Sequence, residues 1–203
     1  MRKLILFDID STLIDTHKLW DLRRLNLVKT LNISKEEIKE VEKDYKEYLP
    51  STHDFDPDEY VQRLQQKFGV DILLIKPAFF DKGAYFKSLF PETVSVLKKL
   101  SKKYVLGVFS EGVLNNQMMK LALSGIIKYF DKGNIYILRR KKENASLKKL
   151  PKEAILIDDN LEVLTVVNDK TNIDCIWINR EDKKTRPKFK TIFSLNELEK
   201  FVS

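Results

Sequence analysis

The sequence has little of what secreted or zinc-binding proteins depend on. Cys175 is the one cysteine in 203 residues, so no disulfide can form within the chain, and a reducing compartment suits this composition. Cys175 also lies in an apolar stretch, which favours a buried structural thiol over a reactive one. The histidines are two, His17 and His53, so a site of imidazole and thiolate ligands for zinc is disfavoured.

Long apolar segments are also missing from the sequence. Arg2 and Lys3 lead into a short apolar run that ends at Asp8, and this pattern matches neither a signal peptide nor a membrane-spanning helix. There is no internal repeat and no low-complexity segment. We therefore expect a cytoplasmic protein that has no membrane partner.

Positive charge is in excess, with 37 Lys and Arg against 30 Asp and Glu and a formal net charge of +7. Such an excess can reflect attraction to nucleic acid, to membrane surfaces or to anionic substrates. Here the basic residues are scattered, apart from one dense run at 139–142, and are not interleaved with aromatic residues as in a nucleic-acid-binding surface. We interpret most of them as solvated surface and expect no nucleic-acid partner.

Five short apolar segments have the character of strands that are buried on both faces of a parallel sheet. They are Leu4–Phe7, Tyr104–Phe109, Asn134–Leu138, Ala154–Ile157 and Ile173–Ile178. Helical patterns separate most of them, and this alternation favours right-handed crossover connections. The sequence therefore predicts an α/β fold with a doubly wound, Rossmann-like parallel sheet of about five strands.

The interval between the first two predicted strands is far longer than one crossover connection needs. Its internal signals are helical, because Ser34 followed by Glu37 is a capping-box pattern and Asp56 before Pro57 resembles a cap followed by a first-turn proline. Residues 50–54 and 69–77 resemble connections between helices. We therefore predict a helical cap domain. Its predicted range is residues 16–86, inserted into a core domain of residues 1–15 and 87–203.

Polar residues end three of the predicted strands, where ligands bind in an open α/β sheet. Asp8 and Asp10 are two residues apart at a strand end, so their side chains can converge on one point. Two such carboxylates repel each other unless a cation lies between them, and an all-oxygen ligand set suits Mg²⁺. If the fourth strand lies beside the first, Asp159 supplies a third ligand and Asp158 a neighbouring one.

The segment Phe7-Asp8-Ile9-Asp10-Ser11-Thr12-Leu13 resembles the first motif of the haloacid dehalogenase superfamily, D-x-D-x-T after an apolar strand. Ser110 matches the Ser or Thr of the second motif, a lysine near position 142 matches the third, and Ile157-Asp158-Asp159 resembles the acidic fourth. The order of these motifs, their places at strand ends and the helical insertion after the first all agree with that family. The resemblance covers nearly the whole chain.

The resemblance implies that Asp8 is the nucleophile, which forms an aspartyl-phosphate with the substrate. Asp10 would act as general acid and then as general base. Magnesium would be held by Asp8, the backbone carbonyl of Asp10, and Asp159, with Asp158 beside them. Ser110 would donate a hydrogen bond to a phosphoryl oxygen, while the lysine of the third motif would neutralise the charge on the group in transfer.

Lys142 is our choice for that lysine, because it follows the third predicted strand and precedes a short helical stretch. Lys141 and Lys148 remain open. The residues predicted to contact substrate are Ser11, Thr12, Glu111, Gly112 and His17. Glu111 departs from the family pattern, in which a small polar residue often follows the second-motif residue, and its carboxylate would disfavour a bound phosphate unless it turns away or pairs with a cation.

Two further residues, Trp20 and Arg23, share the first inserted helix with His17 and could contact the leaving group. Alternatively, Trp20 packs in the core of the insertion. His53 has no partner that the sequence identifies.

The carboxylate at Asp10 also indicates the reaction type. In the family that this sequence resembles, dehalogenases lack a carboxylate at this position, because a halide leaves without a proton. Aspartate there implies a phosphatase. A cap that closes over the site would favour a small, soluble phosphomonoester as its substrate. The alternatives are a phosphomutase of the β-phosphoglucomutase type, a nucleotidase, and a binding protein that keeps the fold without turnover; oligomeric state is left open.

Overall fold

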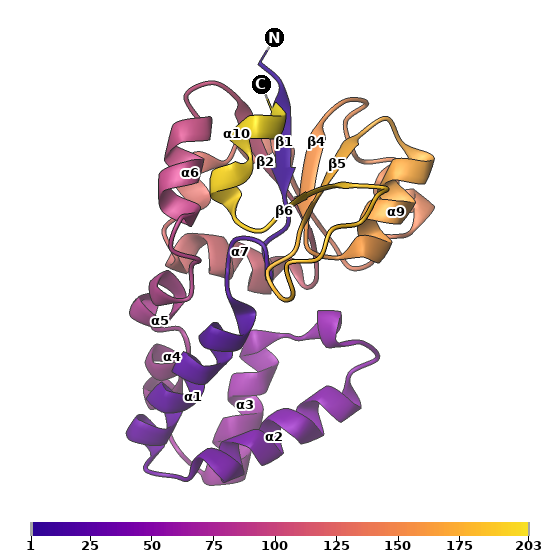
Figure 1. Cartoon of the computed structure of the whole chain (residues 1–203). Helices are drawn as coiled ribbons and strands as arrows, with labels where there is room; N and C mark the ends of the chain where they lie inside the picture. Colours follow the sequence, from indigo (N-terminus) through magenta and orange to yellow (C-terminus); the bar gives the residue numbers. More distant parts are fainter. Residues whose placement is uncertain (1, 203) are drawn as a thin grey trace.

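The computed structural model describes residues 2–202, and its core is one parallel sheet of six strands (Figure 1). The strand order is β3-β2-β1-β4-β5-β6, and every neighbouring pair is parallel. The strands are β1 (Leu4–Phe7), β2 (Val105–Glu111), β3 (Ile135–Leu138), β4 (Ile155–Asp158), β5 (Asp174–Ile178) and β6 (Lys190–Ile192). The predicted doubly wound fold is confirmed. The expected count of about five is corrected to six, because β6 has three residues and forms no recognisable apolar run.

Helices cover both faces of this sheet, as alternation of the buried strand side chains requires. In β1, Ile5 and Phe7 belong to one hydrophobic cluster and Leu6 belongs to another on the opposite face. The first cluster includes side chains of α6 (Thr93–Leu100), α7 (Leu114–Leu123), η4 (Leu195–Glu197) and α10 (Glu199–Val202). The second includes side chains of α8 (Asn144–Leu147) and α9 (Leu161–Lys170), and it contains the buried Cys175. Two short 3-10 turns, η2 (Ile127–Tyr129) and η3 (Lys132–Asn134), lie between α7 and β3.

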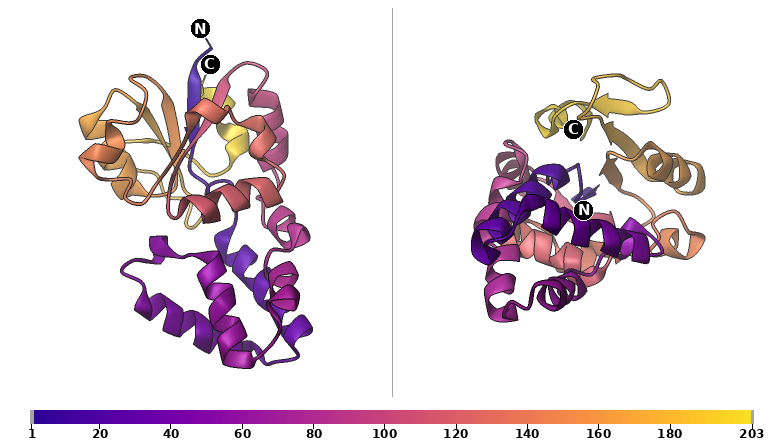
Figure 2. Two further views of the ribbon diagram at one scale, coloured as in Figure 1. Left: turned by 180° about the vertical axis from the view of Figure 1, so that it is seen from behind. Right: turned by 90° about the horizontal axis from the view of Figure 1, so that it is seen from below.

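The segment between β1 and α6 is helical and lies beyond the carboxyl ends of the strands (Figures 1 and 2). It comprises α1 (Thr16–Leu31), α2 (Lys35–Tyr48), η1 (Thr52–Asp54), α3 (Pro57–Phe68), α4 (Ile72–Phe79) and α5 (Lys82–Lys87). Its helices surround a hydrophobic cluster of their own, in which Tyr45, Tyr60 and Phe79 are buried. The limits of residues 16–86 for a separate cap domain stay a prediction.

The helix signals of the sequence have the local geometry that was expected of them. Ser34 and Glu37 form a reciprocal capping box at the start of α2. Asp56 accepts hydrogen bonds from the first turn of α3, which begins with Pro57. None of the helices described in residues 2–202 combines the length and apolar character needed to cross a membrane.

The connection expected over residues 69–77 is wrong, because most of it is α4. Asp71 caps this helix by accepting a hydrogen bond of 2.8 Å from the amide of Leu73. Pro77 lies within the helix and cannot donate a backbone hydrogen bond. Burial of Ile75 and Phe79 in the cluster of the inserted helices compensates for that loss.

Candidate active site

The carboxyl ends of β1, β2 and β4 bring together the polar residues that the sequence places there. β1 lies between β2 and β4, so the residues that follow it face those that end its two neighbours. The amide of Asp8 donates to the carbonyl of Ile157 at 2.9 Å, which continues the β1–β4 ladder by one residue. Asp8 is thereby fixed beside Asp158, and Ser110 is buried at the end of β2.

The carboxylates of Asp8, Asp158 and Asp159 form a cluster in which one oxygen of each lies within 4.8 Å of the others. Burial raises the pKa of Asp8 to about 7; the charges of Asp158 and Asp10 add to this rise and Lys141 opposes it. Burial likewise raises the pKa of Asp159 to about 8, and Asp8 and Asp158 add to it. Without a cation, these carboxylates therefore resist ionising together at neutral pH.

The lysine beside Asp8 is Lys141, and the choice of Lys142 is corrected. Lys141 donates from its Nζ to Asp8 Oδ1 at 2.7 Å and to Asp158 Oδ2, and its side chain is 3% exposed. Lys142 follows it but points outward, with a side chain that is 46% exposed and bonded to Glu162 at 2.7 Å. Lys148, the other open alternative, is exposed.

The donor set of this cluster fits a divalent cation. Asp8 and Asp158 share the charge of Lys141. Asp159, by contrast, forms no salt bridge with any residue in the range 2–202. Its backbone carbonyl accepts a hydrogen bond of 2.8 Å from Trp177. An ion between Asp8 and Asp159 would supply the missing positive charge, and an oxygen-only set suits Mg²⁺ better than a soft metal.

Asp10 is close to this cluster, but its carboxylate has a different set of partners. Lys120 donates to both of its oxygens, at 2.6 and 2.7 Å, while Gln117 and Thr16 donate at 2.8 and 2.7 Å. Burial by itself would raise the pKa of Asp10, but the charge and hydrogen bonds of Lys120, with those of Gln117 and Thr16, lower it to about 2. The carboxylate of Asp10 is thus engaged by protein groups, and the cation contact of its backbone carbonyl that the resemblance implies stays a prediction.

A cavity of about 130 Å³ lies over the carboxylate cluster. Ser11 and Glu111, two of the residues predicted to contact substrate, line it together with Asp8, Ser110 and Lys141. Ser110 Oγ accepts a weak hydrogen bond of 3.3 Å from Gln117. The small cavity thus brings the carboxylate of Asp8, a hydroxyl and an ammonium group around one space.

The other three predicted substrate contacts, Thr12, Gly112 and His17, do not line this cavity. Thr12 is fully buried, and its carbonyl accepts a hydrogen bond of 2.8 Å from Arg180. Gly112 has a φ of 140°, and a Cβ there would lie 3.1 Å from the side-chain amide of Gln117. The described geometry therefore gives Gly112 a role in the turn after β2, where Gln117 must approach closely.

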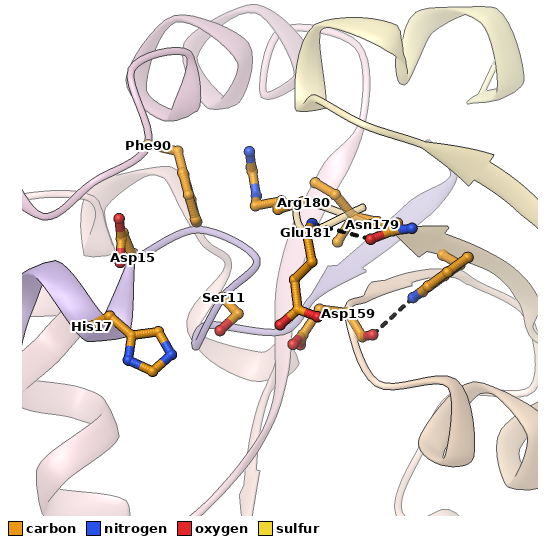
Figure 3. A pocket seen from close by; sticks show the side chains of 10 residues that line it. Ser11, Asp15, His17, Phe90, Asp159, Asn179, Arg180 and Glu181 are labelled. Atoms are coloured by element: carbon orange, nitrogen blue, oxygen red, sulfur yellow. Dashed lines mark hydrogen bonds between the residues drawn. The ribbon is translucent and has the colours of Figure 1, made fainter. Parts of the chain in front are cut away.

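His17 faces a second cavity, of about 280 Å³, which Figure 3 shows from close by. Ser11 and Asp159 form part of its wall, opposite the side chains of Arg180 and Glu181 (Figure 3). Arg180 donates to Glu92 at 3.0 Å and lies 3.5 Å from the centre of the Phe90 ring. The Asp159 carboxylate can therefore be approached from this side as well as from the small cavity.

Glu111 lies near two cations that follow β3, Arg140 and Lys142. Its carboxylate adds to the rise in the pKa of Arg140, whose main cause is the hydrogen bond to Asp54, and adds to that of Lys142, whose main cause is Glu162. These positive charges partly offset the repulsion that Glu111 would exert on a phosphate group in the small cavity.

An ion pair joins the inserted segment to the loop that carries Lys141. Asp54, in η1, accepts from Arg139 at 2.9 Å and from Arg140 at 2.7 Å. The hydrogen bond from Arg140, followed by that from Arg139, lowers the pKa of Asp54 to about 2. Since His53 lines the small cavity next to Asp54, this pair holds His53 at the site.

Sequence reasoning missed Lys120 and Gln117, the two residues of α7 that bond to Asp10. Their spacing of three residues places them on one face of a helix, and this was the available signal. Nothing in the sequence indicated that this face turns toward β1 and away from solvent.

A parallel α/β sheet whose adjoining strand ends carry a buried carboxylate cluster, a hydroxyl and a lysine is typical of hydrolases that act through an aspartate nucleophile. Residues 2–164 match the model of the family described as haloacid dehalogenase-like hydrolase. The chain therefore belongs to this family of hydrolases. Among curated proteins, none matches the sequence significantly.

Solved structures with a similar fold include three hydrolases of this superfamily. The HAD phosphatase of Thermococcus onnurineus is 23% identical, with a TM-score of 0.66 over 100% of this chain and 98% of that one. The HAD-hydrolase YfnB of Bacillus subtilis, bound to magnesium, is 20% identical, with a TM-score of 0.63 over 100% and 99%. The 2-haloacid dehalogenase of Pseudomonas syringae is 20% identical, with a TM-score of 0.61 over 98% and 97%. At these identities the likeness is one of fold.

Proposed function

We propose that this hydrolase is a Mg²⁺-dependent phosphatase of small phosphorylated metabolites, with Asp8 as its nucleophile. The observation that carries the proposal is Asp10, whose carboxylate lies next to the nucleophile and lines the small cavity over it. An alcohol needs a proton as it leaves phosphorus, whereas a halide needs none. A carboxylate at this position supports phosphate-ester hydrolysis over dehalogenation.

In the proposed reaction, an oxygen of Asp8 attacks phosphorus, and the bond from phosphorus to the alcohol oxygen breaks. Water then cleaves the aspartyl-phosphate, which releases inorganic phosphate and restores the carboxylate. Lys141 and Ser110 face the transferring group, where the ammonium offsets its charge and the hydroxyl donates to one of its oxygens. Asp8 and Asp159 would hold Mg²⁺, which would supply positive charge that offsets repulsion between the carboxylate and the phosphate dianion.

The two halves of this reaction require different protonation states of Asp10. Its low pKa, with Lys120 on both oxygens, keeps it ionised at neutral pH, which is the form that removes a proton from the attacking water. The first half requires the protonated form. Asp10 would therefore take up a proton only when bound substrate loosens the contact with Lys120.

The test is release of inorganic phosphate from sugar phosphates, nucleoside monophosphates and an aryl phosphate, with and without Mg²⁺. We expect release that requires Mg²⁺ and falls more than about a thousandfold in Asp8→Asn. Asp44→Asn, which makes the same change on the exposed face of α2, is the matched control and should retain activity.

Three other results would contradict the proposal. Chloride release from a 2-haloacid without phosphatase activity would indicate a dehalogenase. Transfer of phosphate between two sugar positions, with no net release, would indicate a phosphomutase. Absence of any turnover, in protein shown to be folded, would indicate a binding protein.

A further inference from the structure

A larger cavity, of about 380 Å³, opens between the sheet and the inserted helices. Asp10 and His53 line both this cavity and the small one over Asp8, so the two spaces adjoin. If phosphate occupies the small cavity and Asp10 faces the leaving oxygen, the rest of the substrate extends into the larger one. We call this larger space the leaving-group cavity; its lining also includes Trp20, Arg23 and Lys120.

Arg23 is the unusual residue of the leaving-group cavity. It is 1% exposed, and its guanidinium carbon lies 4.3 Å from the ring centre of Phe79, 4.8 Å from that of Tyr85 and 5.2 Å from that of Trp20. It donates to the hydroxyl of Tyr85, while its buried Nε has no acceptor. Within residues 2–202, no carboxylate forms a salt bridge with it. Buried charges are normally paired, so this arginine lacks a counter-charge.

Two other cations that line this cavity, Arg24 and Lys120, each have a carboxylate as counter-charge. Arg24 forms a bidentate pair with Glu42 at 2.8 and 2.7 Å. Lys120 is matched by Asp10. Each of these cations is thus neutralised within the protein, and Arg23 is not.

We propose that Arg23 binds a second anionic group, carried by the leaving alcohol of the substrate. The inference rests on the proposed phosphatase function and names its substrate class: a phosphomonoester whose short carbon skeleton bears a carboxylate or a second phosphate. The guanidinium can bond either anion through its free N–H groups. The skeleton would pack on Trp20 and Phe55, which provide the apolar wall of the leaving-group cavity.

Pairs of esters that differ in this one charge test the proposal. 2-Phosphoglycolate is compared with 2-hydroxyethyl phosphate, and 1,3-propanediol bisphosphate with 3-hydroxypropyl phosphate. We expect kcat/KM to favour the charged member of at least one pair by more than about tenfold, and the favoured pair tells carboxylate from phosphate. In Arg23→Gln this preference should fall to about threefold or less.

The ratio of kcat/KM for the two esters of a pair, measured on one variant, is independent of how much of that variant is folded. Arg23→Lys, which keeps the charge, should retain part of the preference. Arg63→Gln, a change at a half-buried arginine of α3 that does not line the leaving-group cavity, is the control and should leave the ratio unaltered.

Equal kcat/KM for both members of each pair in the wild type would overturn the inference, as would a preference that survives Arg23→Gln. Neither result would touch the phosphatase proposal, since both require phosphate release. Absence of release from all four esters and from the aryl phosphate would instead reject the phosphatase function and this inference with it.

Discussion

At the scale of single residues, neighbours in the sequence have opposite environments after β3. Lys141 is buried between Asp8 and Asp158, while Lys142 is exposed and bonds to Glu162. An ammonium group that faces the transferring phosphate stabilises charge, whereas one on the surface contributes little.

Lys141→Met should therefore lower kcat/KM by about a hundredfold or more, in the range of other losses of a charge-stabilising group. Lys142→Met is the matched control and should change it by less than about threefold, because exposed ion pairs are weak. Steady-state kinetics at saturating Mg²⁺ would measure both, with thermal unfolding to show that each variant is folded. A larger loss in Lys142→Met would reject the assignment of Lys141.

The carboxylates of the site were predictable from the sequence, but its lysine was not. Asp8 and Asp159 follow apolar strands, and the carboxyl ends of neighbouring parallel strands meet whatever the rest of the chain does. The position of a lysine in the run 139–142 depends on how the loop after β3 turns. A shift of one residue in that turn exchanges a buried side chain for an exposed one, and no pattern in the sequence specifies it.

At the scale of elements, sequence reasoning failed where an element is short or contains a helix breaker. β6 has three residues and one buried side chain, Ile192, so neither an apolar run nor alternation can be recognised in it. In α4, Pro77 suggested a connection, but three buried side chains and the cap at Asp71 favour the helix. Whether such elements form depends mainly on tertiary packing and only weakly on the propensities of their own residues.

The ion pair between η1 and the loop after β3 links two elements of the site. Asp54 binds Arg139 and Arg140, and its neighbour His53 lines both the small cavity and the leaving-group cavity. Asp54→Asn would remove the charge that holds η1 beside Lys141. We expect KM to rise about threefold to tenfold, because the cavity walls would be held less firmly against substrate.

The melting temperature of Asp54→Asn should fall by no more than about 4 °C, since the arginines of this pair are exposed to solvent and such an ion pair contributes about 0–1 kcal/mol. Kinetics and thermal unfolding in low and high salt would measure both effects, with Asp44→Asn as the control. If KM is unchanged while the melting temperature falls, the pair contributes to stability and not to substrate binding.

At the scale of the whole molecule, the site depends on how two groups of elements meet. The order of strands, with β1 between β2 and β4, follows from general rules for parallel sheets and could be expected from the sequence. The leaving-group cavity could not, because it depends on which faces of α1 and α7 oppose each other. His17 and Arg23 were recognised as near Asp8 in sequence, but the burial of Arg23 without a carboxylate partner among residues 2–202 is a property of the folded chain alone.

The carboxylate cluster also predicts how the stability of the whole chain depends on pH and Mg²⁺. Asp8 and Asp159 have pKa values raised to about 7 and about 8, against about 3.9 in an unfolded chain. A raised pKa means that the folded state holds its protons more tightly. This contribution to stability is fully present below about pH 4 and is lost as the pH rises through 7 and 8.

Without Mg²⁺, the melting temperature should therefore decline from about pH 4 to about pH 8 and level off above that, as far as this cluster determines it. Mg²⁺ binds the ionised cluster, so at a hundredfold excess over its Kd it should stabilise the chain by about 2.7 kcal/mol, roughly 5–10 °C for this size. Asp159→Asn removes one of the two carboxyl groups whose pKa is raised. The melting temperature of this variant should therefore depend less on pH, and Mg²⁺ should raise it by less. Thermal unfolding from pH 4 to 9, with EDTA or Mg²⁺, measures these effects. A decline of the same size in wild type and variant, with no shift by Mg²⁺, would place the titrating groups outside this cluster and remove the basis for a cation between Asp8 and Asp159.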